Sequence, residues 1–444
     1  MADNIPHHLK LVLSEKLADS LQGDIVRHTP RTLPGAPSLP GKATVIVGMR
    51  RVGKTTYLQQ LRQQRLNEGT TRNRLPLINF EDERLSGLAA SHLGFLVDEL
   101  ERSLANALGK GKVLWCLDEI QVVPGWEKFV RRLLDQGNVE IALTGSSAAL
   151  LSKEISTSLR GRAWTLFLAP FSFSEYLQHH SIPMHNPRKP ITSVLRAKVE
   201  KAFADWLVTG GFPEVQGHDL ATRNQLLMDY VDVAILRDVV ERHSVSNVLG
   251  LRYMVRSLLG SAGAFFSIEK LHASLKSQGH NISRDTMHQM LTYLEDCFLV
   301  RLVSMESSSV RQRMVNPRKA YPADTGLIPL FDQSGKSNIG HALETAVLVE
   351  LERRSCKVTY VKTASGYEVD FLARYPDGRI ELIQVCADAS DAETADRELR
   401  ALQDAKSLAK SARKILLVLN HNGAPETIPS GIHVMSAWEW ATLT

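Results

Sequence analysis

The chain has 444 residues, enough for about three domains, with 43% hydrophobic and 23% charged residues, which is ordinary for globular proteins. No apolar run approaches the ~18 residues that a membrane span needs, and the N-terminal segment lacks the apolar core of a signal peptide. The 4 cysteines stand far apart without CxxC pairs, which argues against a zinc ribbon or a disulfide framework and favours a reducing compartment. We therefore expect a cytoplasmic protein with no membrane partner, and the net charge of +5 permits a nucleic-acid partner without demanding one.

The order of predicted elements divides the chain into an N-terminal helix with a linker and four domains. A parallel α/β domain is predicted because five short apolar strands alternate with helical stretches. These strands are ATVIVG, PLINF, KVLWCLD, VEIALTG and RAWTLFLAP. A helical segment, a helix–turn–helix followed by a hairpin, and a second mixed α/β domain follow it. The predicted parts are 1–40, 41–170, 171–245, 246–335 and 336–444.

The first predicted strand runs directly into GMRRVGKTT, which has the pattern G-x-x-x-x-G-K-T of a phosphate-binding loop. Gly48 and Gly53 let the backbone curl so that its N–H groups face phosphate oxygens. We expect Lys54 to reach the β- and γ-phosphates of ATP and the Thr55 hydroxyl to coordinate Mg²⁺. The predicted nucleotide-binding residues of this loop are Gly48, Arg50, Arg51, Val52, Gly53, Lys54, Thr55 and Thr56.

Two further strands are predicted to end in catalytic side chains. KVLWCLDEIQ ends in Asp118 and Glu119, and we expect Asp118 to hold Mg²⁺ and Glu119 to orient or deprotonate the attacking water. VEIALTGSS ends in hydroxyl groups, so Thr144 or Ser146 is a candidate sensor of the γ-phosphate. The alternative for these hydroxyls is a cap for the helix that follows.

Three arginines are candidates for a role in hydrolysis. Arg160 and Arg162 follow the sensing strand in ISTSLRGR, where either one is placed to act in trans on the nucleotide of a neighbouring subunit. The alternative is a solvated or structural arginine. Arg237, in ILRDVVERH, is a candidate second sensor in the predicted helical lid.

Five segments stand in an order that resembles a group of bacterial and archaeal P-loop ATPases of the AAA+ class. They are GMRRVGKTT, LDEIQVVPGWE, LTGSSAALLSKEISTSLRGR, PFSFSEYL and GGFPEV, and the resemblance extends from about Ala43 to Thr444. It implies ATP binding and hydrolysis, a helical lid over 171–245, and assembly through shared ATP sites into a ring or another oligomer, a hexamer among the options. The C-terminal domain of this group resembles the PD-(D/E)xK nuclease core.

The segment from Ile268 to Val303 is predicted to form a winged helix that contacts DNA backbones. Met287, Met290, Leu291, Leu294 and Phe298 form an apolar stripe at helical spacing, which we assign to the core. The polar side of this helix and the basic hairpin behind it provide the predicted DNA-binding residues, which are Arg284, His288, Arg311, Arg313, Arg318 and Lys319. The alternative is a winged helix with a purely structural role.

The C-terminal sequence YEVDFLARYPDGRIELIQVCAD predicts a β-hairpin. Carried over from the nuclease core, Glu344 matches the helical acid and Asp370 matches the acid of the hairpin. The (D/E)-x-K triplet falls on Gln384, Val385 and Cys386, so one carboxylate and the lysine are missing. Because a metal-dependent nuclease needs both, we predict a degenerate site that does not cut DNA.

Taken together, these patterns predict an oligomeric, Mg²⁺-dependent AAA+ ATPase that binds and remodels duplex or branched DNA. The alternative hypothesis is an ATP-dependent switch that acts on a protein partner through the C-terminal domain. The basic hairpin favours DNA, whereas the modest net charge and the acidic end of the predicted recognition helix, Glu295–Asp296, favour a protein.

Overall fold

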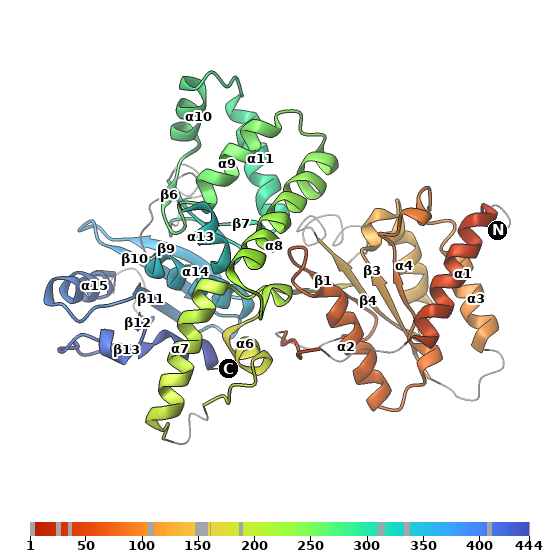
Figure 1. The fold of residues 1–444 in the computed structure, drawn as a ribbon, viewed down its shortest axis with the longest axis horizontal. Helices are drawn as coiled ribbons and strands as arrows, with labels where there is room; N and C mark the ends of the chain where they lie inside the picture. Colours follow the sequence, from red (N-terminus) through yellow and green to blue (C-terminus); the bar gives the residue numbers. More distant parts are fainter. Residues whose placement is uncertain are drawn as a thin grey trace. The chain divides into compact units, whose positions relative to one another are not determined.

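The computed structural model describes residues 5–23, 28–33, 38–104, 111–146, 159, 161–185, 190–307, 309, 311, 316–332, 338–405 and 411–443. The chain divides into two compact units, Met1–Leu168 and Ala169–Thr444. Figure 1 draws the first unit in red to orange tones and the second from yellow to blue. Within the described ranges, none of the helices combines the length and the apolar character needed to cross a membrane.

The first unit is built on one sheet of five parallel strands in the order β2-β3-β4-β1-β5. The predicted parallel α/β sheet is therefore confirmed. β1 and β3 are buried along their whole length, as expected for strands that are covered on both faces. Because β4 lies between β1 and β3, its end lies between the phosphate-binding loop and Asp118. The strands are β1 (Ala43–Val47), β2 (Leu77–Asn79), β3 (Val113–Asp118), β4 (Val139–Gly145) and β5 (Ala163–Phe167).

The N-terminal helix packs on the ATPase sheet. It buries Leu9, Leu13 and Leu17, which are one turn apart, and contacts α3 and β2. Arg62 of α2 donates to the carbonyl oxygen of Ser20 in α1 at 2.5 Å. The predicted boundary at residue 40 therefore does not separate α1 from the sheet. Helices of this unit include α1 (His7–Gln22), α2 (Lys54–Asn67), α3 (Gly94–Leu104) and α4 (Trp126–Asp135).

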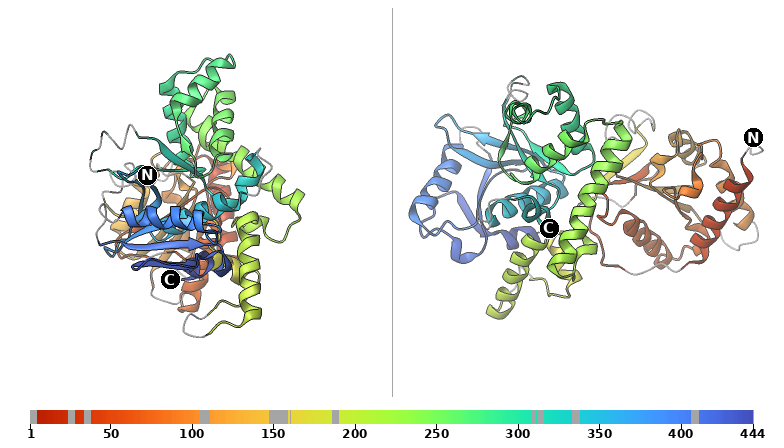
Figure 2. Two further views of the ribbon diagram at one scale, coloured as in Figure 1. Left: turned by 90° about the vertical axis from the view of Figure 1, so that its left-hand side faces the viewer. Right: turned by 45° about the horizontal axis from the view of Figure 1, so that its top comes forward.

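The second unit contains a five-stranded sheet in the order β13-β12-β11-β10-β9, antiparallel from β9 to β11 and parallel from β11 to β13. The predicted hairpin is confirmed as β10 and β11. Side chains alternate between the two faces: Leu382 joins a core with α15, whereas Ile383 joins a larger core with α7 and α14. Figure 2 shows the same sheet, in blue, in two further views. The strands are β9 (Lys357–Lys362), β10 (Glu368–Arg374), β11 (Ile380–Cys386), β12 (Arg413–Val418) and β13 (Ile432–Ser436).

The larger core groups the helices differently from the predicted domain boundaries. It joins two helices of the predicted lid segment to helices and strands from beyond residue 335. Their apolar faces are therefore buried together rather than in separate domains. The helices in contact with this sheet or its cores are α6 (Phe173–His179), α7 (Ser193–Thr209), α14 (Ile339–Arg353), α15 (Ala392–Asp404) and α16 (Ala437–Thr442).

A smaller antiparallel sheet, in the order β6-β8-β7, belongs to the segment predicted as a winged helix. Its N-terminal strand, β6, has 2 residues, too few to produce an alternating sequence pattern, and was not among the predicted elements. The residues of the predicted apolar stripe are buried, four of them on α11, whereas Phe298 follows the end of this helix. The elements follow in the order α9 (Val248–Leu259), β6 (Phe265–Phe266), α10 (Ile268–Ser277), α11 (Arg284–Asp296), β7 (Val300–Val303) and β8 (Arg318–Pro322).

The loop TGGFPEV of the second unit is held by a buried carboxylate. Asp324 accepts the N–H of Gly211 at 2.8 Å and the N–H of Gly326 at 3.0 Å. A Cβ atom at Gly210 would lie 1.8 Å from Asp324 Oδ1, so a larger residue does not fit there. Burial raises the pKa of Asp324 to about 6, although both N–H donors lower it. Between this loop and α9 lie α8 (Leu220–Val233) and a π-helical segment, Ala234–Glu241.

Candidate functional site

The phosphate-binding loop connects β1 to α2 and is shaped by two glycines. A Cβ atom at Gly48 would lie 2.2 Å from the carbonyl oxygen of Leu168, so glycine is required by this close approach. Gly53, directly before α2, has a φ of 93°, in the left-handed region that glycine adopts without strain. Arg51 has a φ of 66°, a conformation uncommon for a residue with a Cβ atom. The local chain therefore has the tight curl that the sequence pattern predicts.

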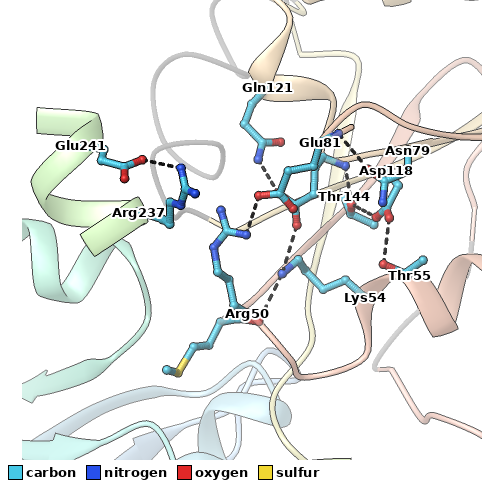
Figure 3. Close-up of polar contacts among 12 residues, drawn as sticks. Arg50, Lys54, Thr55, Asn79, Glu81, Asp118, Gln121, Thr144, Arg237 and Glu241 are labelled. Atoms are coloured by element: carbon cyan, nitrogen blue, oxygen red, sulfur yellow. Dashed lines mark hydrogen bonds and ion pairs between the residues drawn. The ribbon is translucent and has the colours of Figure 1, made fainter. Parts of the chain in front are cut away.

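Lys54, which is labelled in Figure 3, contacts both the loop and the carboxylate of Glu119. Its Nζ donates to the carbonyl oxygens of Gly48 and Met49, at 3.2 Å each. The same nitrogen lies 3.4 Å from Oε1 of Glu119. Gln121 donates to the other oxygen of Glu119, so both carboxylate oxygens of Glu119 are oriented by neighbouring donors.

Asp118 is the centre of a hydroxyl–carboxylate network that joins three elements (Figure 3). The Thr55 hydroxyl, at the start of α2, donates to Asp118 Oδ2 at 2.8 Å. The Thr144 hydroxyl, on β4, donates to Asp118 Oδ1 at 2.6 Å and accepts the N–H of Glu119 at 2.9 Å. Thr55 and Asp118 supply adjacent oxygen ligands of the kind that Mg²⁺ prefers, so these residues fit a magnesium site.

Burial and neighbouring charges act differently on the two acids. Burial raises the pKa of Asp118, and the charge of Glu119 adds to this effect, while the hydroxyl groups of Thr144 and Thr55 lower it. Burial also opposes the ionisation of Glu119, but the Lys54 ammonium and the other donors around it outweigh burial, so the pKa of Glu119 lies below its usual value. Glu119 is therefore ionised at neutral pH, as a base or water-orienting group needs to be.

The other predicted residues of the nucleotide site have separate local roles. Arg50 pairs with Glu81 at 2.6 Å, and Val52 is fully buried. Thr56 is half-buried in the first turn of α2, and Ser146 is buried directly after β4. The sensor role of Ser146 stays a prediction, whereas the single proton of the Thr144 hydroxyl is already donated to Asp118.

The arginines predicted to take part in hydrolysis belong to different units of the chain. Arg162, in the first unit, is exposed and pairs with Asp135. Arg160 lies outside the described residues. Arg237 belongs to the π-helical segment of the second unit and pairs with Glu241 at 2.9 Å across one turn. Their roles in hydrolysis stay predictions.

Among the predicted DNA-binding residues, the exposed cations are partly neutralised within the chain. Arg284 lies 3.1 Å from Glu269, and Arg318 lies 3.8 Å from Glu295. His288 and Arg311 are exposed, and Arg313 lies outside the described residues. Two of these basic side chains therefore have an acidic neighbour in the same chain, which lowers the positive potential that they offer.

Lys319 does not lie on the surface, and its prediction as a DNA contact is wrong. Only 4% of the residue is exposed. Its Nζ lies 3.0 Å from Glu344, 2.7 Å from Glu368 and 3.0 Å from Asp370. The sequence places this lysine in a basic segment, but β8 turns it inward toward α14 and β10. The structure thus joins Lys319 to Glu344 and Asp370, the two acids predicted for the nuclease-like site.

Gln384 and Cys386, the remaining members of the predicted nuclease-like site, do not contact this ammonium group. Gln384 accepts the N–H of Asp370 at 3.3 Å and donates to Glu398 of α15 at 2.6 Å. The thiol of Cys386 donates to the carbonyl oxygen of Asp388 at 3.1 Å. Both side chains therefore serve local structure on the α15 side of β11.

Four polar residues at these two sites were not predicted from the sequence. Glu368 stands two residues before Asp370 on one strand, so the period of two was a usable signal for a shared face. Gln121 follows Glu119 closely, but its contact depends on the turn after β3. Tyr321, whose hydroxyl donates to Glu344 at 2.6 Å, and Glu398 become neighbours only through the tertiary fold. Within the described ranges, three or more His, Cys, Asp or Glu side chains are nowhere grouped so as to hold a metal ion.

A parallel sheet with a phosphate-binding loop after β1 and a buried Asp118–Glu119 pair after β3 defines a P-loop ATPase domain. Residues 40–177 match the family model described as an AAA domain, which confirms the expected ATPase class. Residues 200–336 match a domain of unknown function, DUF8612.

The relatives extend the similarity over most of the chain. The uncharacterized protein MJ1544 of Methanocaldococcus jannaschii is 34% identical over 415 residues, which cover 91% of this chain and 89% of the relative. An uncharacterized protein of Haemophilus influenzae is 28% identical over 397 residues, which cover 89% of this chain and 93% of the relative. The chain belongs to the same family as the Methanocaldococcus protein.

Solved structures match more distantly. The Walker-type ATPase of Pyrococcus abyssi is 16% identical with a TM-score of 0.38, over 72% of this chain and 94% of that chain. The Orc1 protein of Aeropyrum pernix in complex with DNA is 15% identical with a TM-score of 0.28, over 75% of this chain and 94% of that chain.

Proposed function

We propose that this protein is an oligomeric ATPase that uses Mg²⁺-dependent ATP hydrolysis to bind and remodel duplex or branched DNA. The observation that carries the ATPase part is the buried network in which Glu119 lies 3.4 Å from Lys54 and is oriented by Thr144. In this network Lys54, at the start of α2, is a cation that can bind phosphate. Glu119, directly after β3, is an ionised carboxylate that can act on water. Such positioning and charge placement account for most of the catalysis of phosphoryl transfer.

The roles of the residues follow from their positions. The loop from Gly48 to Thr56 binds the phosphates through its N–H groups and Lys54. Thr55 and Asp118 hold Mg²⁺, which neutralises charge on the phosphates when bound. Glu119 orients the attacking water and accepts its proton. Because Lys54 and Glu119 attract each other in the protein alone, binding of phosphate competes with this ion pair for the ammonium group.

DNA binding is proposed for the segment from α9 to β8. Its order of helix, strand, helix, helix and two strands, with an antiparallel sheet, is the order expected of a winged helix, in which a helix and a hairpin hold the DNA backbone. Arg284, His288 and Arg311 are exposed on this segment. Backbone contact is favoured over base readout because the exposed cations are few and one is paired with Glu269.

We further propose that the nuclease-like C-terminal part holds DNA or assembles with other subunits and does not cut DNA. The support is that Glu344 and Asp370 contact Lys319, while Gln384 and Cys386 are turned toward α15 and its preceding loop. A carboxylate from position 384 and a lysine from position 386 are not available to complete a metal-dependent site.

One observation favours action on a protein partner instead. Arg284 and Arg318 are each close to a glutamate of the same chain, which lowers the positive potential available to DNA. In that case the same ATPase cycle acts as a switch for the docking of a protein on the second unit.

The test measures phosphate release by the full chain with no DNA, with duplex, with single-stranded DNA and with a four-way junction. We expect duplex or junction DNA to stimulate hydrolysis several-fold. A double Arg284→Ala/Arg311→Ala variant should lose the stimulation and lower the salt dependence of binding by about one log–log unit per lost phosphate contact. The matched control is Lys201→Ala, an exposed lysine of α7 in the same unit and outside α9–β8. Equal rates with and without every DNA, and no binding by anisotropy, would favour the protein-partner function.

A further inference from the structure

The second unit buries one ammonium group among three carboxylates. Lys319 lies on the central strand of the β6-β8-β7 sheet, Glu344 lies on α14, and Glu368 and Asp370 lie on β10. The three distances from Nζ are 2.7–3.0 Å. Side chains from three elements that are far apart in the chain therefore converge on one nitrogen.

The geometry uses the whole hydrogen-bonding capacity of the lysine. An ammonium group has three N–H donors, and three carboxylates surround Lys319. Asp370 is occupied on both sides, since Oδ1 accepts from Lys319 and Oδ2 accepts the N–H of Val385 at 3.0 Å. No donor of Lys319 remains for a phosphate group of a nucleic acid.

The backbone of β10 is bent where it supplies this cluster. The pairing of β10 with β9 shifts register between Val369 and Leu372, and Asp370 lies inside the shifted stretch. Such bulges re-aim side chains. Tyr321, two residues after Lys319 on β8, adds a second donor to Glu344 at 2.6 Å, so the carboxylates are oriented from β8 by two side chains.

The charges of the cluster are unbalanced without the lysine. Three carboxylates and one ammonium carry a formal charge of −2, and removal of the ammonium would leave −3. Of the three carboxylates that share this place, Asp370 is buried and Glu344 and Glu368 are half-buried. Carboxylates so close together need a compensating cation, and carboxylate oxygens are the ligands that hard divalent cations prefer. Burial and the nearby Asp370 raise the pKa of Glu344 to about 7, although Lys319 opposes them; the carboxyl groups are thus crowded even with the ammonium present.

We propose that Lys319 is a built-in replacement for a divalent cation. While its ammonium is present, the described residues form no group that could hold a metal ion; once the lysine is removed, the three carboxylates bind Mg²⁺, Mn²⁺ or Ca²⁺. This inference deepens the proposed function, because it explains why the C-terminal part does not cut DNA. The lysine also links β8 to α14 and β10 through its ion pairs. Because the ammonium takes the place of a metal ion, these elements stay together without bound metal.

The test compares Lys319→Met with the wild-type full chain and with Lys357→Met, an exposed lysine of β9. All measurements are made without nucleotide and without DNA. Lys319→Met should melt at a lower temperature and should recover when Mn²⁺ or Ca²⁺ is added at millimolar concentration. It should bind Mn²⁺ at one extra site by titration calorimetry or by electron paramagnetic resonance, at least about tenfold more tightly than the wild type. The wild type and Lys357→Met should show neither effect.

Two outcomes would overturn the proposal. The first is a folded Lys319→Met protein that gains no Mn²⁺ site. The second is a wild-type protein that binds Mn²⁺ at a site lost in Asp370→Asn, because the carboxylates would then hold metal and lysine together. If Lys319→Met does not fold, Lys319→Gln, which removes the charge but keeps a hydrogen-bond donor and all three carboxylates, serves for the same titration. DNA-stimulated hydrolysis is measured separately, so failure here leaves that part of the proposed function standing.

Discussion

Thr144 is the residue whose substitution tests the catalytic network most directly. Its hydroxyl donates to Asp118 and accepts the N–H of Glu119, and the residue is fully buried. Thr144→Val keeps the shape of the side chain and removes both hydrogen bonds. Thr144→Ser keeps the hydroxyl and removes only a methyl group, which makes it the matched control.

The magnitudes follow from the two lost contacts. A buried N–H without its acceptor costs about 1–3 kcal/mol, and a hydrogen bond to a carboxylate contributes roughly 1.5–3 kcal/mol. Thr144→Val should therefore destabilise the first unit by about 2–4 kcal/mol, whereas Thr144→Ser should cost about 1 kcal/mol for the methyl group. For a unit of this size the valine variant should melt about 4–16 °C lower than the wild type.

The effect on hydrolysis should appear in kcat. Glu119 has a φ of 51°, an uncommon conformation that the bond to Thr144 helps to hold. A displacement of the catalytic carboxylate by about 1 Å lowers the rate of reaction roughly a hundredfold. We therefore expect Thr144→Val to lower kcat by about tenfold to a hundredfold with KM for ATP nearly unchanged, because the loop and Lys54 are untouched.

The assay is steady-state phosphate release at a temperature where both variants are folded, checked by circular dichroism. Equal kcat values for the valine and serine variants would refute the positioning role of the hydroxyl. A higher KM with an unchanged kcat would instead indicate that Thr144 contacts the nucleotide itself, which is the sensor role predicted from the sequence.

The remaining predictions concern three other places in the chain. Lys54→Ala should abolish binding of a fluorescent ATP analogue, and Glu119→Gln should bind it but hydrolyse ATP about 10²–10⁴-fold more slowly; normal hydrolysis by both variants would contradict the assignment. If Arg162 acts in trans, Arg162→Ala should lose ATPase activity and should regain part of it when mixed with Lys54→Ala subunits. A protein that is monomeric in the presence of ATP and hydrolyses it at the full rate would exclude that role. The pKa of Asp324 is raised in the folded protein, so its proton is bound more tightly in the folded than in the unfolded chain. Its contribution to stability should fall by up to about 3 kcal/mol as pH rises from about 4 to 6; urea unfolding of Asp324→Asn should lack this slope, and an identical pH profile would contradict the burial argument.

The sequence by itself determined the elements whose signals are local. The strand-to-helix placement of GMRRVGKTT, the acidic pair after a buried strand and the alternation around the PDG turn each depend on neighbours within a few residues. Local patterns of this kind reflect backbone geometry and burial on one face. The parallel sheet, the phosphate-binding loop, Asp118, Glu119 and the hairpin could therefore be predicted without coordinates.

The tertiary structure alone decided which distant side chains meet. The position of β4 between β1 and β3 makes Thr144 a partner of both acids, and no pattern along the chain specifies that strand order. Lys319 stands in a basic segment of the sequence, yet burial against α14 and β10 turns it from a candidate DNA contact into the cation of a carboxylate cluster. Gln384 likewise donates a hydrogen bond to Glu398 of α15, which packs on the face of the sheet. Charge in a sequence gives a residue its chemistry, but only packing decides whether that charge faces water or three carboxylates, because desolvation depends on neighbours from every element of the fold.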